Sequence, residues 1–369
     1  ENGLYRIEVI DGVKYVIVKT VPYSGNVLSR ILNMLIFAHN LKKTANRLIK
    51  GSDTPDVILA SSVHPWTVQA GLKIAKKHHI PCICEIRDLW PETLISLNYI
   101  SPKSLITKYL QNKEKFLYEH ADRIVFTMEG GPDYIRDMHW DTDNGGKIDL
   151  SKVNHINNGV DLSLFDLHAS QYSRLFSDMF REGFVNFIYA GSLRAANDIN
   201  IVLRPFVRLL NEGHKINFIV VGDGPDRDRL QRLYQHCEYI HFVGRVEKEK
   251  VPALLIQSDV AVLCYHSLAV FKYGGSHNKL FEYMAAGKPV LSTIRSGYDL
   301  ISANHFGLSL ADCNEDAVYD AIKHLTLLPK EELVKMGVLA RKTVKNFDFK
   351  VLSKELSAVI DDVTVEERV

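Results

Sequence analysis

The sequence predicts an α/β protein with two doubly wound parallel sheets, one in each half of the chain. Strand-like apolar runs alternate with helical segments up to about residue 127, and the same alternation starts again at Val185. Nearly all of these runs are apolar along their whole length, which is typical of parallel strands that are covered by helices on both faces. The length of 369 residues is enough for two such domains.

In the first half, Gly12 marks a hairpin-like start before a strand over 13–20, and a long helix is predicted over 27–50. The helix has a broad apolar face and a basic polar side, so it either covers a sheet or contacts a membrane. The apolar face consists of Leu28, Ile31, Leu32, Leu35, Ile36 and Leu41. We predict further strands over 56–61, 81–87 and 123–127, and helices over 67–78 and 103–120.

The second half follows the turn signal Asn158-Gly159. Residues 163–183 are polar and aromatic without a long periodic pattern, and the alternation then resumes. We predict strands over 185–190, 216–222, 239–243, 259–264 and 289–293, with a short strand near Gly307. Helices are predicted over 198–212, 226–235, 250–257, 330–344 and 348–361, with another starting near Ser276. We therefore expect an N-terminal domain over 1–163, a second domain over 164–345, and a C-terminal helix over 346–369 that packs on the N-terminal domain.

Composition and charge argue against several classes of protein. Forty-five basic and 44 acidic residues give a net charge of +1, which leaves no electrostatic footprint for nucleic acid. The five cysteines are odd in number, and Cys82 and Cys84 on one predicted strand are a poor pair for a disulfide or a metal. We expect no signal peptide and no membrane span, since no apolar run reaches ~18 residues. The expected compartment is the reducing cytoplasm. Because the sequence opens on Glu1, we expect the true N-terminus to lie upstream.

Polar side chains stand at the ends of the first-half strands, where ligands bind in parallel sheets. His64 follows the strand over 56–61, and the Arg87-Asp88 pair closes the strand over 81–87. Asp88 has the chemistry to orient an acceptor hydroxyl or to take part in proton transfer. The alternative is structural: Arg87 and Asp88 form an ion pair that fastens the loop, and His64, which precedes a proline, has a packing role.

The stretch from Phe271 to Thr293 combines loop, helix, tight turn and buried strand. The Gly274-Gly275 pair lets the backbone approach a ligand, and Ser276 is the expected N-cap of the helix. Free amide groups at the start of a helix attract an anion. Glu282 lies one turn beyond Asn278, where a carboxylate can bind a diol. A phosphate and a ribose fit these features, and the alternative is an ordinary capped helix with a solvated glutamate.

Other strand ends in the second half carry similar features. Gly191 and Arg194 follow one strand, and a glycine with a nearby cation suits a diphosphate. Gly222 begins a tight turn, and Arg245 stands at a strand end where its guanidinium can stack on or hydrogen-bond a base. No G-x-G-x-x-G follows a strand and no G-x-x-x-x-G-K-[ST] occurs, which argues against a nicotinamide dehydrogenase and a P-loop NTPase.

The motifs AGS, VVGDGP, HFVGRV and SHNKLFEYMAAGKPVL resemble those of the family-4 retaining glycosyltransferases of GT-B fold. In the first half, DVILASSVHPW, CEIRDLWPE, ADRIVFTMEGG and NHINNGVDL are similar to the N-terminal domain of that family. RDLWP and the SHNKLFEYM helix look like the subgroup that makes O-antigens and capsules, the fucosamine-transferase-like members. The resemblance extends from about residue 11 to 345 and implies two Rossmann-like domains that face a cleft.

The resemblance implies that the second domain binds a UDP-sugar donor. Glu282 would bind the ribose hydroxyls, and the amides from Ser276 through Asn278 to Lys279 would bind the diphosphate. Arg245 would lie near the base. Arg194 would be a phosphate partner, and Gly191 would give the backbone clearance.

On the acceptor side, Asp88 would match the polar residue of the family, and Asp88, Arg87 and His64 are our candidate catalytic residues. The resemblance implies no metal and no other cofactor, because the helix N-terminus and cations neutralise the leaving diphosphate. An Asp-x-Asp, Asp141-Thr142-Asp143, lies in a polar loop of the other domain, away from the expected phosphate site.

Three features depart from the family pattern. Gly274 stands eight residues before Glu282, where the family has a second glutamate, so the motif leaves the donor sugar open. Ser192 and Asn197 stand where the family often carries an arginine and a lysine. The first strand of the family and its glycine-rich loop would precede Glu1.

The leading hypothesis is a retaining transferase that moves an N-acetyl or deoxy amino sugar from a UDP-sugar to a polyprenyl-linked or saccharide acceptor in O-antigen or capsule synthesis. Two alternatives stay open: a sugar-nucleotide epimerase with the same two-domain architecture, and a non-catalytic nucleotide-sugar-binding subunit. The resemblance also implies weak peripheral contact with the cytoplasmic face of the membrane. The expected contact surfaces are the basic-and-apolar helices over 27–50 and 100–117.

Overall fold

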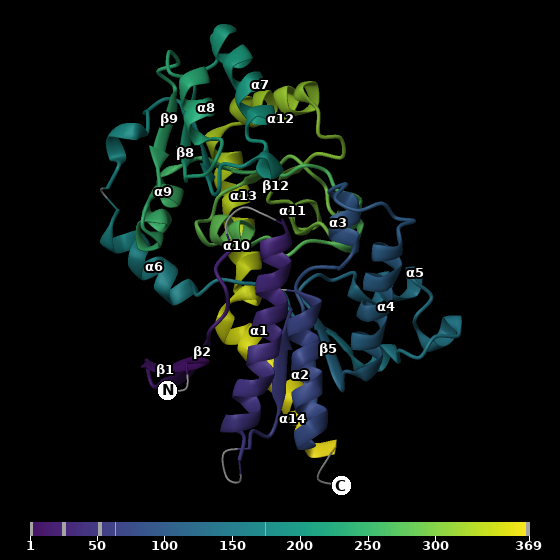
Figure 1. The fold of residues 1–369 in the computed structure, drawn as a ribbon. Coiled ribbons are helices and arrows are strands. Elements are labelled where there is room, and N and C mark those ends of the chain that lie inside the picture. Colours follow the sequence, from purple (N-terminus) through teal and green to yellow (C-terminus); the bar gives the residue numbers. More distant parts are fainter. Residues whose placement is uncertain (1–2, 24–26, 51–53, 63, 174, 367–369) are drawn as a thin grey trace. The chain divides into compact units, whose positions relative to one another are not determined.

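The computed structural model describes residues 3–23, 27–50, 54–62, 64–173 and 175–366, so Glu1 and Val63 lie outside the described residues (Figure 1). The chain divides into two compact units. Unit 1 combines Glu1–Ile156 with Glu355–Val369, and unit 2 is the continuous segment Asn157–Lys354.

Unit 1 contains an antiparallel hairpin, a parallel sheet and the helices that cover this sheet. The hairpin turns at Gly12, as predicted, between β1 (Tyr5–Ile10) and β2 (Val13–Val18). The parallel sheet has the order β3-β4-β5-β6, with strands β3 (Ile58–Ser61), β4 (Cys82–Ile86), β5 (Arg123–Phe126) and β6 (Val153–His155). The helices are α1 (Val27–Leu48), α2 (Pro65–His78), α3 (Glu92–Ser96), α4 (Leu105–His120) and α5 (Gly131–Asp137).

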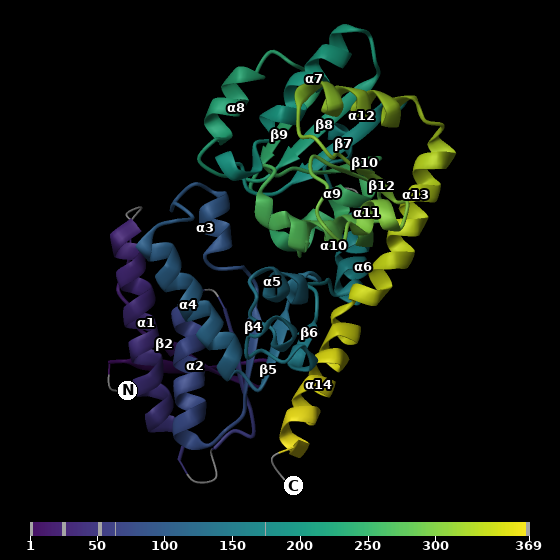
Figure 2. The ribbon, with the colours of Figure 1, turned by 90° about the vertical axis from the view of Figure 1, so that its right-hand side faces the viewer.

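Helices cover both faces of the unit 1 sheet, as its apolar strands predict (Figure 2). On one face, Tyr118 of α4 packs edge-on against Phe126 of β5, with ring centroids 5.5 Å apart. On the other face, Val363 of α14 (Phe349–Glu366) is buried with Ile83 and Val125. The final helix of the chain therefore completes the core of unit 1.

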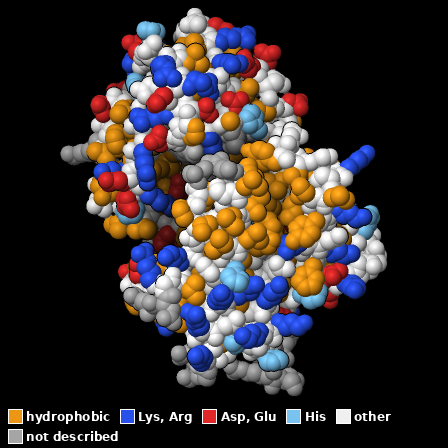
Figure 3. Space-filling view, in the orientation of Figure 1, with side chains coloured by type: hydrophobic (Ala, Val, Ile, Leu, Met, Phe, Trp, Pro, Cys, Tyr) orange, Lys and Arg blue, Asp and Glu red, His pale blue; other side chains and the backbone are white. Residues whose placement is uncertain are grey.

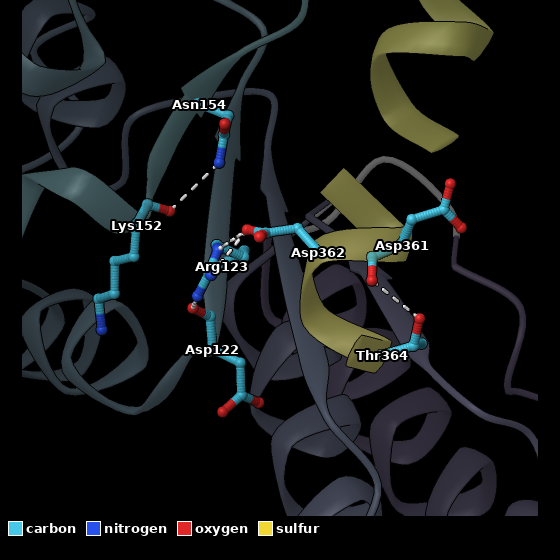
Figure 4. Close-up of polar contacts among 7 residues, drawn as sticks. All are labelled: Asp122, Arg123, Lys152, Asn154, Asp361, Asp362 and Thr364. Carbon is cyan, nitrogen blue, oxygen red and sulfur yellow. Dashed lines mark hydrogen bonds and ion pairs between the residues drawn. The ribbon is translucent and has the colours of Figure 1, made fainter. Parts of the chain in front are cut away.

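A polar contact fastens the end of α14 to the sheet of unit 1 (Figure 4). Arg123 at the start of β5 donates from Nε and Nη2 to Oδ2 of Asp362, at 3.0 and 2.7 Å. The guanidinium also donates from Nη1 to the carbonyl oxygen of Asp122 at 3.0 Å. Because Arg123 is mostly buried and its fork is planar, this contact fixes the direction of the helix more closely than a surface lysine pair would.

Unit 2 is a doubly wound parallel sheet with the strand order β12-β11-β10-β7-β8-β9, which reverses between β10 and β7. Two buried apolar clusters, one on each face, enclose the sheet. The strands are β7 (Val185–Ala190), β8 (Ile216–Val221), β9 (Ile240–Gly244), β10 (Val260–Leu263), β11 (Val290–Ser292) and β12 (Gly307–Ser309). The helices are α6 (Leu162–Gln171), α7 (Asn200–Asn211), α8 (Arg227–Leu233), α9 (Val251–Gln257), α10 (Asn278–Ala285), α11 (Leu300–Ala303), α12 (Glu315–Leu327) and α13 (Lys330–Thr343).

Several short elements escape the sequence prediction. Helix α6 forms in the segment that shows no long period, because Asp161 caps it by accepting from the Leu164 amide at 2.8 Å and because Phe165 and Ala169 are buried four residues apart. Helix α12 has a similar cap at Asn314, which accepts from the Ala317 amide at 2.9 Å. The prediction also missed α3, α5, α11 and β6.

The long helix α1 does not cover the sheet with its leucine-rich face. It packs on α2 and buries Met34 and Ala38, whereas Leu28 is 74% and Leu32 51% exposed. On the same unit, Leu105 at the start of α4 is 86% exposed. Figure 3 shows hydrophobic side chains gathered on one face of unit 1, with lysines and arginines beside them. Among the described helices, none has the length and hydropathy of a membrane span.

Candidate functional site

Two glycine turns pack against each other at the carboxyl ends of β7 and β8. The Gly191 amide donates to the carbonyl oxygen of Val221 at 2.8 Å, and the Leu193 amide donates to that of Asp223 at 2.9 Å. Gly222 has a φ of +140°, and a Cβ there would stand 1.8 Å from the carbonyl oxygen of Gly191. The close approach of the two turns therefore requires glycine at position 222.

These turns line an open hollow of about 580 Å³ in unit 2. Three of the predicted donor-binding residues, Gly191, Gly222 and Arg245, meet there, and the Arg245 side chain is exposed. The hollow is also lined by Ser192, Asp223 and Gly224. The strand-end pattern of the sequence thus brings together residues from three different strands.

Lys279, in the first turn of α10, lies directly over Gly191. A Cβ at position 191 would stand 2.1 Å from Cε and 2.4 Å from Nζ of this lysine. The ammonium group donates to the Tyr189 hydroxyl at 3.2 Å, and it lies 4.9 and 5.3 Å from the ring centroids of Tyr189 and Tyr265. Burial lowers the pKa of Lys279 to about 8. The ion pairs of the described residues include none to Lys279.

Glu282 stands one turn further along α10 and is half-buried. Burial raises the pKa of its carboxyl above the usual value, and the cations Lys248 and Lys279 oppose that rise. Lys248, just before α9, was not predicted from the sequence. The helix therefore presents a cation and then a carboxylate, which matches the order of a phosphate and a diol in a nucleotide.

Ser276 is not the N-cap of α10, contrary to the sequence prediction. The N-cap position belongs to His277, whose side chain makes no capping hydrogen bond. The Ser276 hydroxyl instead accepts from the Asn158 amide at 2.8 Å and also contacts the Asn157 side chain. Because Ser276 fastens the loop to the connector at Asn157, the first turn of α10 keeps its amide groups without a capping side chain.

The loop before α10 turns at Gly274, whose φ of +91° suits a glycine. A Cβ at Gly275 would stand 2.6 Å from Nε2 of His277, so the glycine pair lets the imidazole fold back over the loop. The His277 ring stacks on Tyr265 with centroids 4.4 Å apart, and burial lowers its pKa to about 4. The neutral ring packs tightly, while Asn278 is exposed at the start of the helix.

Arg194 lines a second, smaller hollow rather than the one formed by the glycine turns. Its side chain is exposed, and its charge contributes to lowering the pKa of Lys279. Asn197 is buried and donates to the Ser192 carbonyl oxygen at 2.7 Å and to the Tyr189 hydroxyl at 3.1 Å. Where the resembling family often has two cations, this chain has a hydrogen bond between Asn197 and Ser192.

The candidate catalytic residues of unit 1 lie at the ends of β3 and β4. His64 accepts from the Thr67 amide at 3.2 Å through Nδ1 and so caps α2, which supports the structural alternative for this residue. Among the described residues, no ion pair joins Arg87 to Asp88, so the structural alternative of an ion pair that fastens the loop is wrong. Asp88 is exposed, yet partial desolvation by its surroundings raises the pKa of its carboxyl, and the Arg87 charge offsets part of this rise.

Within the described part of the chain, no three His, Cys, Asp or Glu side chains gather as a metal site requires. The Asp-x-Asp of unit 1 has a local role at its first residue. Both carboxylate oxygens of Asp141 accept from the Asn144 side chain, at 2.9 and 3.0 Å.

Comparisons with known proteins find similarity in the segment that contains these site residues. Residues 185–327 match the family described as "Glycosyl transferases group 1". The matched segment lies within unit 2 and is similar to this family over about two fifths of the chain. The matched segment contains the glycine turns, Lys279 and Glu282.

Among curated proteins, the chain is similar to the "Putative colanic acid biosynthesis glycosyltransferase WcaL" of Escherichia coli K12, with 26% identity over 178 residues. This match covers 47% of the chain and 44% of WcaL, so the chain spans less than half the length of this relative. The protein of the same name from Salmonella typhimurium is 23% identical over 181 residues, and the match covers 48% of this chain and 45% of that protein.

Solved structures show that the chain has the GT-B fold. A UDP-forming α,α-trehalose-phosphate synthase from Burkholderia vietnamiensis matches with a TM-score of 0.75, 12% identity, 100% coverage of this chain and 90% of its own. Anabaena Alr3699/HepE in complex with UDP and glucose matches with a TM-score of 0.64, 13% identity, and 92% and 84% coverage.

The burial of Lys279 at the start of α10 predicts its titration. We expect the dimethylated, ¹³C-labelled side chain of Lys279 to titrate near pH 8 in NMR spectra, because burial disfavours its charged form. The reference value for a lysine in water is about 10.4, so the Lys279 signal should titrate well below that value. The Lys279→Arg variant assigns the signal. A midpoint for Lys279 at that reference value would contradict the buried placement.

Proposed function

We propose that the chain is a retaining glycosyltransferase that moves a sugar from a UDP-sugar to a lipid-linked or saccharide acceptor in the synthesis of a cell-surface polysaccharide. The sugar class that we favour is an N-acetyl or deoxy amino sugar. Unit 2 would bind the donor, and Asp88 of unit 1 would act on the acceptor side.

The observation that carries this proposal is the unpaired Lys279 cation over the glycine turn at Gly191. When a glycosyl bond to a nucleotide breaks, negative charge develops on the departing diphosphate. A fixed cation and free helix amides stabilise that charge without having to reorganise. Gly191 and Gly222 give the phosphates access to the backbone, and Glu282 is placed one turn along the same helix to accept hydrogen bonds from the ribose hydroxyls.

The relatives support the nucleotide and the pathway class. HepE was solved with UDP and with glucose, and the name of WcaL places that protein in colanic acid biosynthesis. For this chain, a UDP-sugar donor and a saccharide acceptor are the corresponding proposals. The exposed Asp88 carboxyl, with its raised pKa, is suited to exchange a proton with an acceptor hydroxyl.

The proposal is tested by incubating the protein with radiolabelled UDP-glucose, UDP-galactose and UDP-N-acetylglucosamine, each with and without a bacterial lipid extract. Transfer of label into the extract supports the transferase. Interconversion of the UDP-sugars without an extract would favour the epimerase with the same two-domain architecture. Binding of UDP without either reaction would favour a non-catalytic nucleotide-sugar-binding subunit.

We expect Glu282→Ala to weaken UDP binding by about 1.5–3 kcal/mol, because the ribose loses a charged hydrogen-bond acceptor. Isothermal titration calorimetry should show a roughly 10- to 150-fold rise in Kd. The control is Glu247→Ala, which removes an exposed carboxylate before α9 that is paired with Lys250. Equal affinities for wild type and Glu282→Ala, with both folded, would show that Glu282 does not bind the ribose.

We also predict that transfer activity survives EDTA, because Lys279 and the α10 amides can neutralise the leaving diphosphate. The measurement is the initial rate before and after dialysis against the chelator. A complete loss of rate that Mn²⁺ or Mg²⁺ restores would refute metal independence. In that case, Asp143→Ala would test whether the Asp141–Asp143 loop holds the ion.

We further propose that unit 1 contacts an anionic membrane surface at the cytoplasmic face, where a polyprenyl-linked acceptor would lie. The exposed leucines of α1, together with Leu105 and Ile106 of α4, supply apolar contact. The neighbouring basic residues are Arg30, Lys43, Arg47, Lys103 and Lys108, all of them exposed. Each cation near an anionic surface contributes about 1 kcal/mol, which is enough for weak, reversible association.

Co-sedimentation with vesicles tests this contact. At low salt, we expect more protein in the pellet with phosphatidylglycerol vesicles than with phosphatidylcholine vesicles, and less when salt is added. Leu28→Asp should reduce pelleting, because it places a charge in the apolar surface. Leu327→Asp, at an exposed leucine of unit 2, is the matched control. Full recovery of wild type in the supernatant with both lipids would exclude the membrane surface.

A further inference from the structure

A buried glutamate at the centre of unit 1 accepts three hydrogen bonds. Glu114 of α4 is 3% exposed. Its Oε1 accepts from the Tyr118 hydroxyl at 2.7 Å and from the Trp90 amide at 3.1 Å, and its Oε2 accepts from the Tyr134 hydroxyl at 2.5 Å. Within the described residues, none of its partners is a cation, so three neutral donors satisfy the carboxylate.

The Trp90 amide belongs to the turn that carries Asp88. At the other end of that turn, the Arg87 amide donates to the Ser62 hydroxyl at 3.0 Å. Asp88 therefore lies between two backbone amides that are hydrogen-bonded to side chains: the Arg87 amide to Ser62, just after β3, and the Trp90 amide to Glu114 of α4. Asp88, Trp90 and Glu114 also line the same small void.

We propose that Glu114 is a positioning residue that holds the Asp88 turn in place for the acceptor reaction. This role rests on the proposed function, but the attachment itself can be measured without activity. Glutamate suits the position because a carboxylate has enough lone pairs to accept from three converging donors. Leucine in its place would remove the side-chain acceptor of the Trp90 amide, at a cost that the turn can lower by moving toward water.

The charge state of Glu114 provides a second way to test its hydrogen bond to the Trp90 amide. The pKa of its carboxyl is raised to about 8, mainly because burial disfavours the charged form; the nearby Glu92 adds to this rise, and the hydrogen bonds from Tyr134, Tyr118 and Trp90 oppose it. Below that pH, the carboxyl carries a proton that it must donate, so one tyrosine hydroxyl has to rotate. The ionised form accepts from all three donors without any such rotation.

Two variants separate the attachment of Trp90 from the rest of the network. Tyr118→Phe/Tyr134→Phe removes two donors and keeps the bond from Glu114 to the Trp90 amide. Adding Glu114→Leu removes that bond and leaves an apolar interior with one unpaired amide. Glu119→Leu on the same helix is the control, since no side-chain contact links it to the turn in the described structure.

Hydrogen–deuterium exchange of the peptide that contains Trp90 is the primary measurement. We expect the triple variant to exchange this amide at least tenfold faster than the double variant. UDP affinity, which belongs to unit 2, should be unchanged, and transfer to the lipid extract should fall at least tenfold. Equal exchange in the two variants would overturn the proposal, and so would a loss of transfer without faster exchange. If wild type transfers no sugar, the proposed function fails while the exchange comparison still decides the attachment.

The conservative Glu114→Gln variant keeps the test valid if the triple variant does not fold. The three tryptophans of the chain all lie in or beside this network. The ring centroids of Trp90 and Trp66 are 6.4 Å apart, and the ring centroid of Trp140 lies 6.0 and 5.7 Å from those of Tyr118 and Tyr134. Near-ultraviolet circular dichroism should change with a midpoint near pH 8 in wild type and stay flat in Glu114→Gln. The wild-type transfer rate should rise through the same pH range, and this rise should be absent in the variant. A transfer rate with the same pH dependence in wild type and in Glu114→Gln would refute the role of Glu114.

Discussion

The arrangement of the glycine turns and Lys279 in unit 2 depends on the absence of a side chain at position 191. Any Cβ there would occupy the space of the Lys279 side chain, and the carbonyl oxygen of Gly191 leaves room only for glycine at position 222. Steric exclusion therefore links the end of β7, the end of β8 and the first turn of α10. The ammonium group lies near the rings of Tyr189 and Tyr265, and no carboxylate of the described residues pairs with it.

The two units solve opposite electrostatic problems. In unit 2, a partly buried cation is left without a counter-ion, at a cost that binding of an anion would recover. In unit 1, a buried carboxylate is satisfied by three neutral donors, so it needs no ligand and can serve a structural purpose. An unpaired buried charge next to open space is thus a stronger indication of a binding site than a fully hydrogen-bonded one.

The sequence was sufficient to predict the parallel sheets, because their strands are apolar throughout. It also placed Gly191 and Gly222 correctly after strand ends, and Lys279 and Glu282 on one helix, while their role in donor binding stays a prediction. It could not predict the role of Ser276, since a serine before a helix looks like a cap whether its hydroxyl bonds forward or, as here, to Asn158. Glu114 was missed for a related reason: its partners are brought to it by packing and not by spacing along the helix. The face of α1 was predicted correctly as apolar, but periodicity does not reveal whether such a face meets protein or solvent.

The discontinuity of unit 1 has a consequence for synthesis on the ribosome. The strands β4 and β5 are translated before unit 2, but Val363, which packs on Ile83 and Val125, is translated after all of unit 2. Unit 2 is continuous and can fold before the chain is released, whereas the nascent sheet of unit 1 must wait with one apolar face open. A chain released after unit 2 would have a folded unit 2 and a unit 1 whose sheet exposes one apolar face, and such a chain would be a substrate for chaperones.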